Sequence, residues 1–195
     1  MKVLILDCVK NDLSPETQSV VEKFTEGIKD AGGEVKIYNI NDLDIKPCFS
    51  CTSQSSFQYD DKCRCDDDMN KLYPVFRESE VWVFVSHINS NGSTNYLRNL
   101  LDRMEPLFQP IYLLDSASVT IPPDNKMKGK MLLLSSYEYE SADLARSISD
   151  YIDSIGLLFS KETDGNILFD KSRIDLTRLE QFFKAGQSLV LNARN

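Results

Sequence analysis

Lys2-Val3-Leu4-Ile5-Leu6 opens the chain as a short, almost continuously apolar run. Such a run is typical of a strand in the middle of a parallel sheet, because both faces of that strand are covered by other elements. The polar loop behind it ends at Ser14-Pro15, which predicts a helix N-cap followed by a proline in the first turn. Gly32-Gly33 is expected to end that helix. The sequence therefore begins with a central strand that leads into a helix.

The same alternation of strand and helix continues along the chain. Further strands are expected at residues 34–40, 81–86, 131–134 and 157–169, the last with a turn or bulge at Asp164-Gly165. Helices are expected from Asp66 or Asp67 to Phe76 and over residues 94–108, 142–155 and 175–191. This order predicts the α/β class, with a five-stranded, doubly wound parallel sheet.

Length and charge narrow the class of protein. The chain has 195 residues and a net charge of −8. The length fits a single domain, residues 1–195, with a cysteine-rich insertion at about 46–66. The acidic charge argues against a nucleic-acid or anionic membrane surface, and no apolar run approaches the roughly 18 residues that span a bilayer. The first residues do not resemble a signal peptide, so we expect a soluble cytoplasmic protein whose thiols are reduced.

The stretch from Pro47 to Met69 carries four of the five cysteines, in a Cys-x2-Cys pair and a Cys-x-Cys pair. These cysteines are Cys48, Cys51, Cys63 and Cys65. Two such pairs that meet across a loop supply four soft thiolates, the ligand set of zinc and of iron-sulfur clusters. The alternative is free thiols or a disulfide in a surface loop, because a Cys-x-Cys arm is unusual in a zinc ribbon. The acidic run 66–68 is expected to cap a helix rather than to bind a metal.

Three polar loops follow apolar strands, at residues 8–17, 86–93 and 135–139. They are expected to converge at the carboxyl edge of the sheet, where helix N-termini bind phosphate and aromatic rings hold flat ligands. His87, the single histidine, could donate a hydrogen bond to a quinone-like carbonyl of a ligand or act as a pH-sensitive proton donor. The alternative is a polar loop residue that bonds a neighbouring backbone carbonyl. Arg98 and Arg103 are expected to form helix ion pairs, with Arg103 next to Asp102.

Three motifs in the first half of the chain carry a resemblance to a known family. They are Ile45-Lys46-Pro47-Cys48-Phe49-Ser50-Cys51, Cys63-x3-Asp67-Asp68-Met69 and Leu97-x3-Leu101-Asp102-Arg103. Together they resemble the flavodoxin-like NADPH-dependent FMN reductases and, within that group, the iron-sulfur flavoproteins. The likeness extends to about residue 110, and Thr17 with Phe24-x-Glu26-Gly27 also fits the family's first helix.

This resemblance implies a three-layer flavodoxin-like fold, strand order 2-1-3-4-5, and an FMN-dependent oxidoreductase or electron-transfer protein. By position, Ser14 and Thr17 would contact the FMN phosphate. The flavin ring would be lined by Ser86, His87, Ile88, Asn89, Ser90, Asn91 and Gly92 and closed on its far side by Ser135, Ser136 and Tyr137. A [4Fe-4S] cluster, as in the iron-sulfur members, would be held by Cys48, Cys51, Cys63 and Cys65. The implied partner is a nicotinamide nucleotide or a redox protein, and the implied assembly is a homodimer or homotetramer.

Two other functions remain open from the residues. One is a degenerate flavodoxin-like binding or assembly module without flavin, whose cysteines hold a structural zinc. Asp7, Asp12 and Glu16 favour this alternative, because they place negative charge where a phosphate dianion would bind. The other is a quinone or nitroaromatic reductase that contains no metal.

Overall fold

The structure is a computed structural model that describes most of the chain. The described residues are 1–9, 14–49, 63, 65–89, 92–93, 95–107, 114–115, 118–119, 129–137, 142–159, 161–163 and 165–192. The elements along them are β1 (Lys2–Asp7), α1 (Pro15–Asp30), β2 (Glu34–Asn39), η1 (Ile40–Asp42), α2 (Met69–Glu78), β3 (Val81–Asn89), β4 (Gly92–Ser93), α3 (Asn95–Asp102), η3 (Glu105–Leu107), β5 (Leu114–Asp115), β6 (Ser118–Val119), β7 (Lys130–Tyr137), α4 (Ala142–Leu158), β8 (Glu162–Thr163), β9 (Ile167–Asp170), η5 (Lys171–Arg173) and α5 (Leu176–Asn192).

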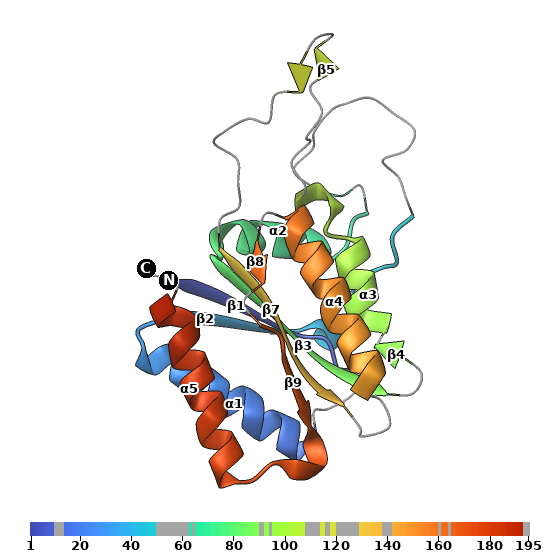
Figure 1. Ribbon diagram of the computed structural model, residues 1–195. Coiled ribbons are helices and arrows are strands. Elements are labelled where there is room, and N and C mark those ends of the chain that lie inside the picture. The colour runs from blue at the N-terminus through green and yellow to red at the C-terminus, as the bar shows by residue number, and fades with distance from the viewer. Residues whose placement is uncertain are drawn as a thin grey trace.

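The main sheet is parallel, and β1 lies inside it. β1 pairs with β2 on one side and with β3 on the other, while β3 pairs with β7. β8 and β9 both pair with β7 in parallel at the far edge (Figure 1). The order β2-β1-β3-β7-β8 confirms the predicted 2-1-3-4-5 arrangement, with the fifth strand in two pieces. The short β4 returns antiparallel against the end of β3.

Helices cover both faces of this sheet. α1 and α5 pack on one face, and α2, α3 and α4 pack on the other (Figure 1). Side chains alternate along β3 accordingly: Val83 and Val85 face the α1–α5 layer, whereas Trp82 and Phe84 face the α2–α4 layer. Both sets are fully buried, which explains why β3 reads as a continuous apolar run instead of an alternating one.

The break in the fifth strand has a specific cause. Gly165 adopts a positive φ of 69°, which turns the chain between β8 and β9. The neighbouring Asn166 fills the gap in the ladder, because its Oδ1 accepts the Leu133 N–H of β7 at 2.7 Å. Its Nδ2 donates to Asp153 Oδ1 of α4, also at 2.7 Å. The predicted interruption at Asp164-Gly165 is thus confirmed, and a side-chain amide replaces the missing backbone partner.

Several element boundaries differ from the sequence expectation. α3 ends at Asp102 and is followed by the short η3, whereas the pattern predicted a helix to residue 108. Pro106 explains the early end, because it has no N–H to donate to the Asp102 carbonyl. α4 continues to Leu158, so residues 157 and 158, predicted to begin the last strand, are helical; a short apolar run fits a buried helix as well as a strand. α2 begins at Met69 with Asp68 at the N-cap position, one or two residues after the predicted cap at Asp66 or Asp67. Within the described part of the chain, no helix has the length and apolar composition needed to cross a membrane.

Candidate functional site

The carboxyl ends of β1, β3 and β7 meet at one edge of the sheet. In register, Asp7 at the end of β1 lies opposite Val85 of β3, and Ser86 lies opposite Ser135 of β7. The helices that follow β1 and β3 pack on opposite faces of the sheet (Figure 1). The topological switch point therefore lies between these two strands, where doubly wound folds typically have a ligand-binding crevice. The structure therefore brings together the described ends of the three predicted loops.

The first part of the site is the N-terminus of α1. Ser14 caps this helix, since its Oγ accepts the Thr17 N–H at 3.3 Å. The hydroxyls of Ser14 and Thr17 lie 3.2 Å apart, and Thr17 is buried. A helix N-terminus presents N–H groups and a partial positive charge, which suit a phosphate. Ser14 and Thr17, the residues predicted to contact the FMN phosphate, therefore lie together at this helix N-terminus.

The two described acidic side chains near the start of α1, Asp7 and Glu16, have pKa values that are shifted in opposite directions. Asp7 is nearly buried and its carboxylate accepts the Val9 N–H at 3.0 Å, so it bonds its own loop. Burial raises the pKa of Asp7, the Val9 hydrogen bond opposes this, and nearby Asp42 adds to the rise. Glu16 is exposed, and its own backbone N–H and the Ser14 hydroxyl lower its pKa. Asp12, the third predicted acid, lies outside the described residues.

Ser86 and Ser135 point into the protein interior. Both are fully buried, and their hydroxyl oxygens lie 2.9 Å apart. The Ser135 hydroxyl also bonds the Ser86 carbonyl at 2.8 Å. These hydroxyls join β3 to β7, so any contact that the two residues make with a flavin would come from their backbone.

The next pair along the strands lies closer to the crevice. The half-buried His87 shares a 2.9 Å hydrogen bond between its Nδ1 and the Ser136 Oγ, on the face of the sheet that α1 covers. This bond to a side-chain hydroxyl is a contact that the sequence alternatives for His87 did not include. Ile88 is buried and Tyr137, opposite it in the register, is half-buried.

The remaining residues predicted to line the ring follow β3. Asn89 and Gly92 pair across the antiparallel turn between β3 and β4. Ser90 and Asn91, which lie between them, fall outside the described residues. The described features fit an FMN molecule: a hydroxyl-capped helix N-terminus for its phosphate, a polar crevice beside it, and an aromatic residue at the end of β7.

The cysteine-rich insertion emerges on the α2–α4 face. Cys48, Cys63 and Cys65 are partly buried, and Cys51 lies outside the described residues. The thiols of Cys63 and Cys65 are close enough to interact, and burial followed by that interaction raises the pKa of Cys65. Across the described residues, no three cysteine, histidine or acidic side chains come together as a metal-binding group.

Arg103 does not pair with Asp102, which corrects the sequence expectation. Its buried guanidinium binds Asp67 in a two-pronged contact, with Nη2 at 2.9 Å from Asp67 Oδ1. Asp102 pairs with Arg98 instead, at 3.9 Å. A residue that sequence analysis missed, Tyr73 of α2, donates its hydroxyl to the Arg103 carbonyl at 2.7 Å. These two contacts join residues that are 30 and 36 positions apart, and local sequence patterns do not predict contacts over such separations.

The acidic run also has more roles than helix capping. Asp67 does accept the Met69 N–H at the start of α2, at 3.2 Å, as a capping group would. Burial would raise the pKa of Asp67, but hydrogen bonds from Arg103 and from the Lys46 N–H hold it below its usual range. Asp68 instead forms an ion pair with Lys71.

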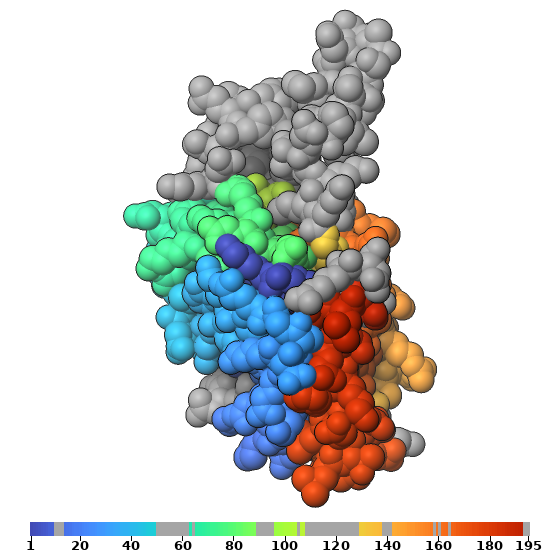
Figure 2. Space-filling view, turned by 90° about the vertical axis from the view of Figure 1, so that its left-hand side faces the viewer, coloured from blue at the N-terminus to red at the C-terminus, as the bar shows by residue number. Residues whose placement is uncertain are grey.

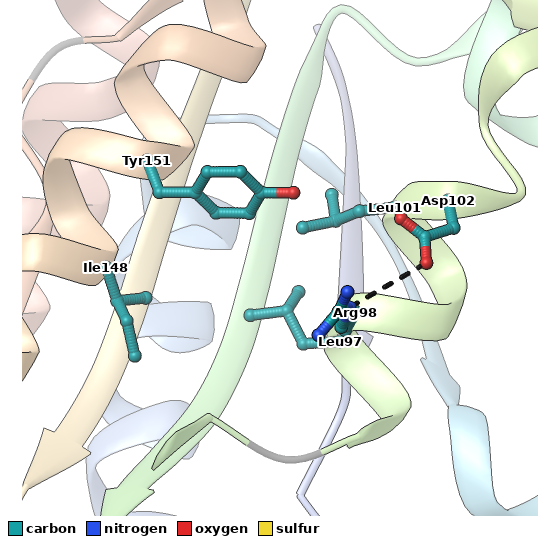
Figure 3. Close-up of a pocket in the computed structure, with 6 residues that line it drawn as sticks. All are labelled: Leu97, Arg98, Leu101, Asp102, Ile148 and Tyr151. Atoms are coloured by element: carbon teal, nitrogen blue, oxygen red, sulfur yellow. Dashed lines mark ion pairs between the residues drawn. The ribbon is translucent and has the colours of Figure 1, made fainter.

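A separate hollow lies between α3 and α4. Its volume is about 350 Å³. Leu97 and Leu101 contribute from α3 and Ile148 and Tyr151 from α4, with the Arg98–Asp102 pair beside them (Figure 3). This hollow contains none of the predicted flavin or metal residues, so it is distinct from the crevice at the strand ends.

Comparisons with known proteins agree with this geometry. The model of the family described as NADPH-dependent FMN reductase matches residues 1–158. A search of curated proteins finds no match. Among solved structures, a flavone reductase has 16% identity and a TM-score of 0.70; the comparison covers 100% of this chain and 64% of that one. The chain thus spans just under two thirds of that protein.

Two further solved structures are similar over nearly their full lengths. An NAD(P)H:quinone oxidoreductase from Methanothermobacter marburgensis has 15% identity and a TM-score of 0.68, covering 97% of this chain and 96% of that one. An FMN-dependent NADH-azoreductase from Bacillus anthracis str. Ames Ancestor, in complex with FMN, has 14% identity and a TM-score of 0.63, covering 100% of both chains. At these identities the structures establish the fold, and the family model, which spans most of the sequence, establishes the relationship. The chain belongs to the NADPH-dependent FMN reductase family.

Proposed function

We propose that this chain is an NAD(P)H-dependent oxidoreductase that binds FMN in the crevice at the ends of β1, β3 and β7. The observation that carries this site is the N-terminus of α1, where the Ser14 and Thr17 hydroxyls lie 3.2 Å apart beside the topological switch of the sheet. The helix supplies unpaired N–H groups and a partial positive charge for the phosphate. The flavin ring would lie between the loops that follow β3 and β7.

In this proposal, the residues of the chain bind FMN and orient its ring. When bound, FMN supplies the electron-transfer chemistry. Ser14 and Thr17 hold the phosphate, and the buried Ser86–Ser135 pair keeps the ends of β3 and β7 at a fixed separation. His87 is oriented by its hydrogen bond to Ser136, at the end of β3 where the flavin ring is proposed to lie. Tyr137 offers an aromatic surface at the end of β7.

Thr17→Ala tests the phosphate site. Loss of a hydrogen bond that leaves a ligand oxygen unsatisfied weakens binding by about 1–3 kcal/mol. Ser19→Ala is the matched control, because the Ser19 hydroxyl donates to the Pro15 carbonyl on an exposed part of the same helix. FMN titration followed by quenching of flavin fluorescence should show weaker binding only for Thr17→Ala. Equal affinity in wild type, Thr17→Ala and Ser19→Ala would contradict the site.

We further propose that the insertion holds a metal through its cysteines, as a [4Fe-4S] cluster or as zinc. Support comes from the interacting thiols of Cys63 and Cys65 and from the position of Cys48 on the opposite arm of the same insertion. Iron, acid-labile sulfide and zinc measured on protein purified without oxygen distinguish the two metals. Iron with sulfide would indicate a cluster that exchanges electrons with the flavin. Zinc in a protein that does not bind FMN would favour the alternative function, a binding or assembly module. A protein that contains no iron, no sulfide and no zinc would contradict the metal proposal.

The electron donor and the assembly belong to the same proposal. A nicotinamide nucleotide is the proposed donor, supported by the description of the family, and a redox protein is the alternative. The homodimer or homotetramer and the cytoplasmic location stay predictions from the sequence. Sedimentation of the FMN-loaded protein measures the first of these directly.

A further inference from the structure

Asn41 lies in η1, the short helical turn that follows β2, and it contacts the loop after β1. Its side-chain Nδ2 donates a hydrogen bond to the Val9 carbonyl, across 32 positions of sequence. Val9 is two residues beyond the end of β1, at the start of the loop that leads to the N-terminus of α1. A side chain from the segment after β2 therefore holds the first loop of the proposed FMN site.

The Asn41 amide is itself held by Asn39, the last residue of β2. The Asn39 Oδ1 accepts a hydrogen bond from the Asn41 backbone N–H at 2.9 Å and another from Asn41 Nδ2 at 2.8 Å. Both asparagines are half-buried. In the register of the sheet, Asn39 lies opposite Asp7, so the turn that carries Asn41 is fixed next to the end of β1. The two N–H donors of the Asn41 amide are thus shared between Asn39 and Val9.

Both backbone polar groups of Val9 are bound within the protein. Its N–H donates to Asp7 Oδ1 at 3.0 Å, and its carbonyl accepts from Asn41. The N–H of the preceding Cys8 donates to the Val85 carbonyl of β3 at 2.9 Å. The Val9 side chain is buried in the α1–α5 layer, where a carbonyl without a partner would be costly.

These contacts fix the direction in which the chain leaves β1. A peptide group is planar, so a hydrogen bond to its carbonyl orients the whole unit. Ser14, which caps α1, is only five positions after Val9. Described contacts therefore fix both ends of a short loop, with Asn41 at its start and the helix cap at its end.

The phosphate is the part of FMN that this loop would meet. The N-terminus of α1 attracts an anion, but oxygen acceptors nearby weaken the attraction unless donors of the protein engage them. The Val9 N–H engages the carboxylate of Asp7, and Asn41 engages the carbonyl of Val9. Loss of the Asn41 donor would free the Val9 carbonyl to turn, and the start of the loop would turn with it.

We propose that Asn41 is a positioning residue for the phosphate of FMN, because it holds the Val9 carbonyl and, through it, the loop between β1 and α1. This inference rests on the FMN site proposed above and adds to it a residue from the segment after β2. Asn41 acts through Val9 and does not itself contact the ligand. Riboflavin has the ring of FMN and no phosphate, so it separates the two halves of the site.

The test compares the binding of FMN and of riboflavin to the whole chain, followed by quenching of flavin fluorescence. Asn41→Leu keeps the approximate size of the side chain and removes the donor. Asn70→Leu is the matched control, because Asn70 of α2 is also half-buried and its Nδ2 also donates to a backbone carbonyl, that of Cys65, at 2.8 Å. The control makes the same chemical change away from the loop after β1.

Wild type and Asn70→Leu should bind FMN equally, and Asn41→Leu should bind it roughly 10-fold more weakly. Riboflavin affinity should be the same in all three proteins. If riboflavin binds to none of them, the FMN affinity of Asn41→Leu relative to Asn70→Leu decides. If Asn41→Leu does not fold, Asn41→Ala replaces it, because it removes the donor without placing a large apolar group beside Val9.

Failure of the proposed function and failure of the positioning role are distinguishable. Wild type that binds neither flavin contradicts the FMN site itself, and wild type that binds both flavins equally contradicts a phosphate site at α1. Wild type that prefers FMN, together with a folded Asn41 variant that has the same ratio of FMN to riboflavin affinity, leaves the FMN site standing and overturns the role of Asn41.

Discussion

Lys161 is a buried lysine on the face of the sheet opposite α1. Its ammonium donates to the carbonyls of Ser79 and Glu80 at 3.2 and 3.0 Å and lies 4.4 Å from the centre of the Trp82 ring. Burial lowers its pKa from the ordinary value of 10.5 to about 8, although nearby Glu80 opposes the change. The charged form is thus held in the interior at neutral pH at the expense of stability.

This arrangement predicts a pH-dependent stability with a defined sign. Between about pH 8 and pH 10.5 the unfolded chain keeps the Lys161 proton while the folded chain loses it. The free energy of unfolding should therefore rise with pH in this window, by about 2 kcal/mol over 1.5 pH units, relative to Lys161→Met. Urea denaturation of both proteins across the window measures the difference.

Lys184→Met is the control for Lys161, because Lys184 lies exposed on α5. That variant should follow the wild-type dependence on pH. A Lys161→Met protein with the same pH slope as wild type would show that the buried lysine keeps its ordinary pKa.

Glu16 bears directly on flavin affinity. Its exposed carboxylate interacts with its own N–H and the Ser14 hydroxyl at the helix N-terminus, so it competes with a phosphate for the same donors. Glu16→Gln should bind FMN more tightly than wild type, and the gain should shrink at high salt as charges are screened. Glu22→Gln, an exposed change farther along α1, should leave the affinity unchanged. Unchanged or weaker FMN binding by Glu16→Gln would contradict this reading of the loop.

Single residues also show where sequence reasoning reached its limit. The cap at Ser14 could be predicted, and is confirmed, because capping is local chemistry that can be read over three or four positions. The burial of the Ser86 and Ser135 side chains could not be predicted, because it depends on the face of the sheet toward which they point and on the register of β3 and β7. Arg103 was paired with its neighbour in sequence, whereas its partner Asp67 is 36 positions away.

Among the elements, α1 and α5 approach each other closely at two glycines, Gly27 of α1 and Gly186 of α5. The two helices lie side by side along one face of the molecule (Figure 2). A Cβ on Gly186 would come within 2.1 Å of the Phe24 carbonyl oxygen, and one on Gly27 within 1.9 Å of the Phe183 carbonyl oxygen. Both clashes are with backbone, which cannot rotate away.

Gly186→Ala should therefore destabilise the protein although alanine favours a helix. The intrinsic gain is about 1 kcal/mol, but separating two packed helices outweighs it, and we expect a net loss of about 1–3 kcal/mol. Lys184→Ala, two residues away on the exposed face of α5, should change stability by no more than about 0.5 kcal/mol. Urea denaturation compares them, and a Gly186→Ala protein at least as stable as wild type would show that the helices separate without loss.

The order of the main strands and helices could be predicted from the sequence, but the residues at which they begin and end could not. The strands β1, β3 and β7 can be recognised in the sequence as apolar runs, because both of their faces are covered. The end of α3 was misjudged by several residues because Leu107 continues the apolar pattern, while Pro106 removes the N–H that a longer helix needs. The division of the fifth strand was foreseen from Gly165, but the ladder contact from Asn166 depends on tertiary packing.

At the scale of the whole molecule, α3 links two regions of the chain. The end of β3 precedes α3, and Arg103, directly after α3, binds Lys46 and Asp67 on the two arms of the cysteine-rich insertion. The doubly wound topology follows from the strand and helix pattern alone, so the position of the topological switch point was predictable. The contacts of Arg103 were not predictable, because they join three segments that are distant in sequence.

The central claim is that the crevice binds FMN and that a nicotinamide nucleotide reduces it. The most direct measurement is the absorbance of the FMN-loaded protein, mixed with NADPH without oxygen and compared with FMN alone and with Thr17→Ala. We expect the flavin absorbance of the wild-type complex to bleach rapidly and in proportion to NADPH. Wild-type protein that takes up no FMN from an excess, or that holds FMN which NADPH and NADH both leave oxidised, would contradict the account.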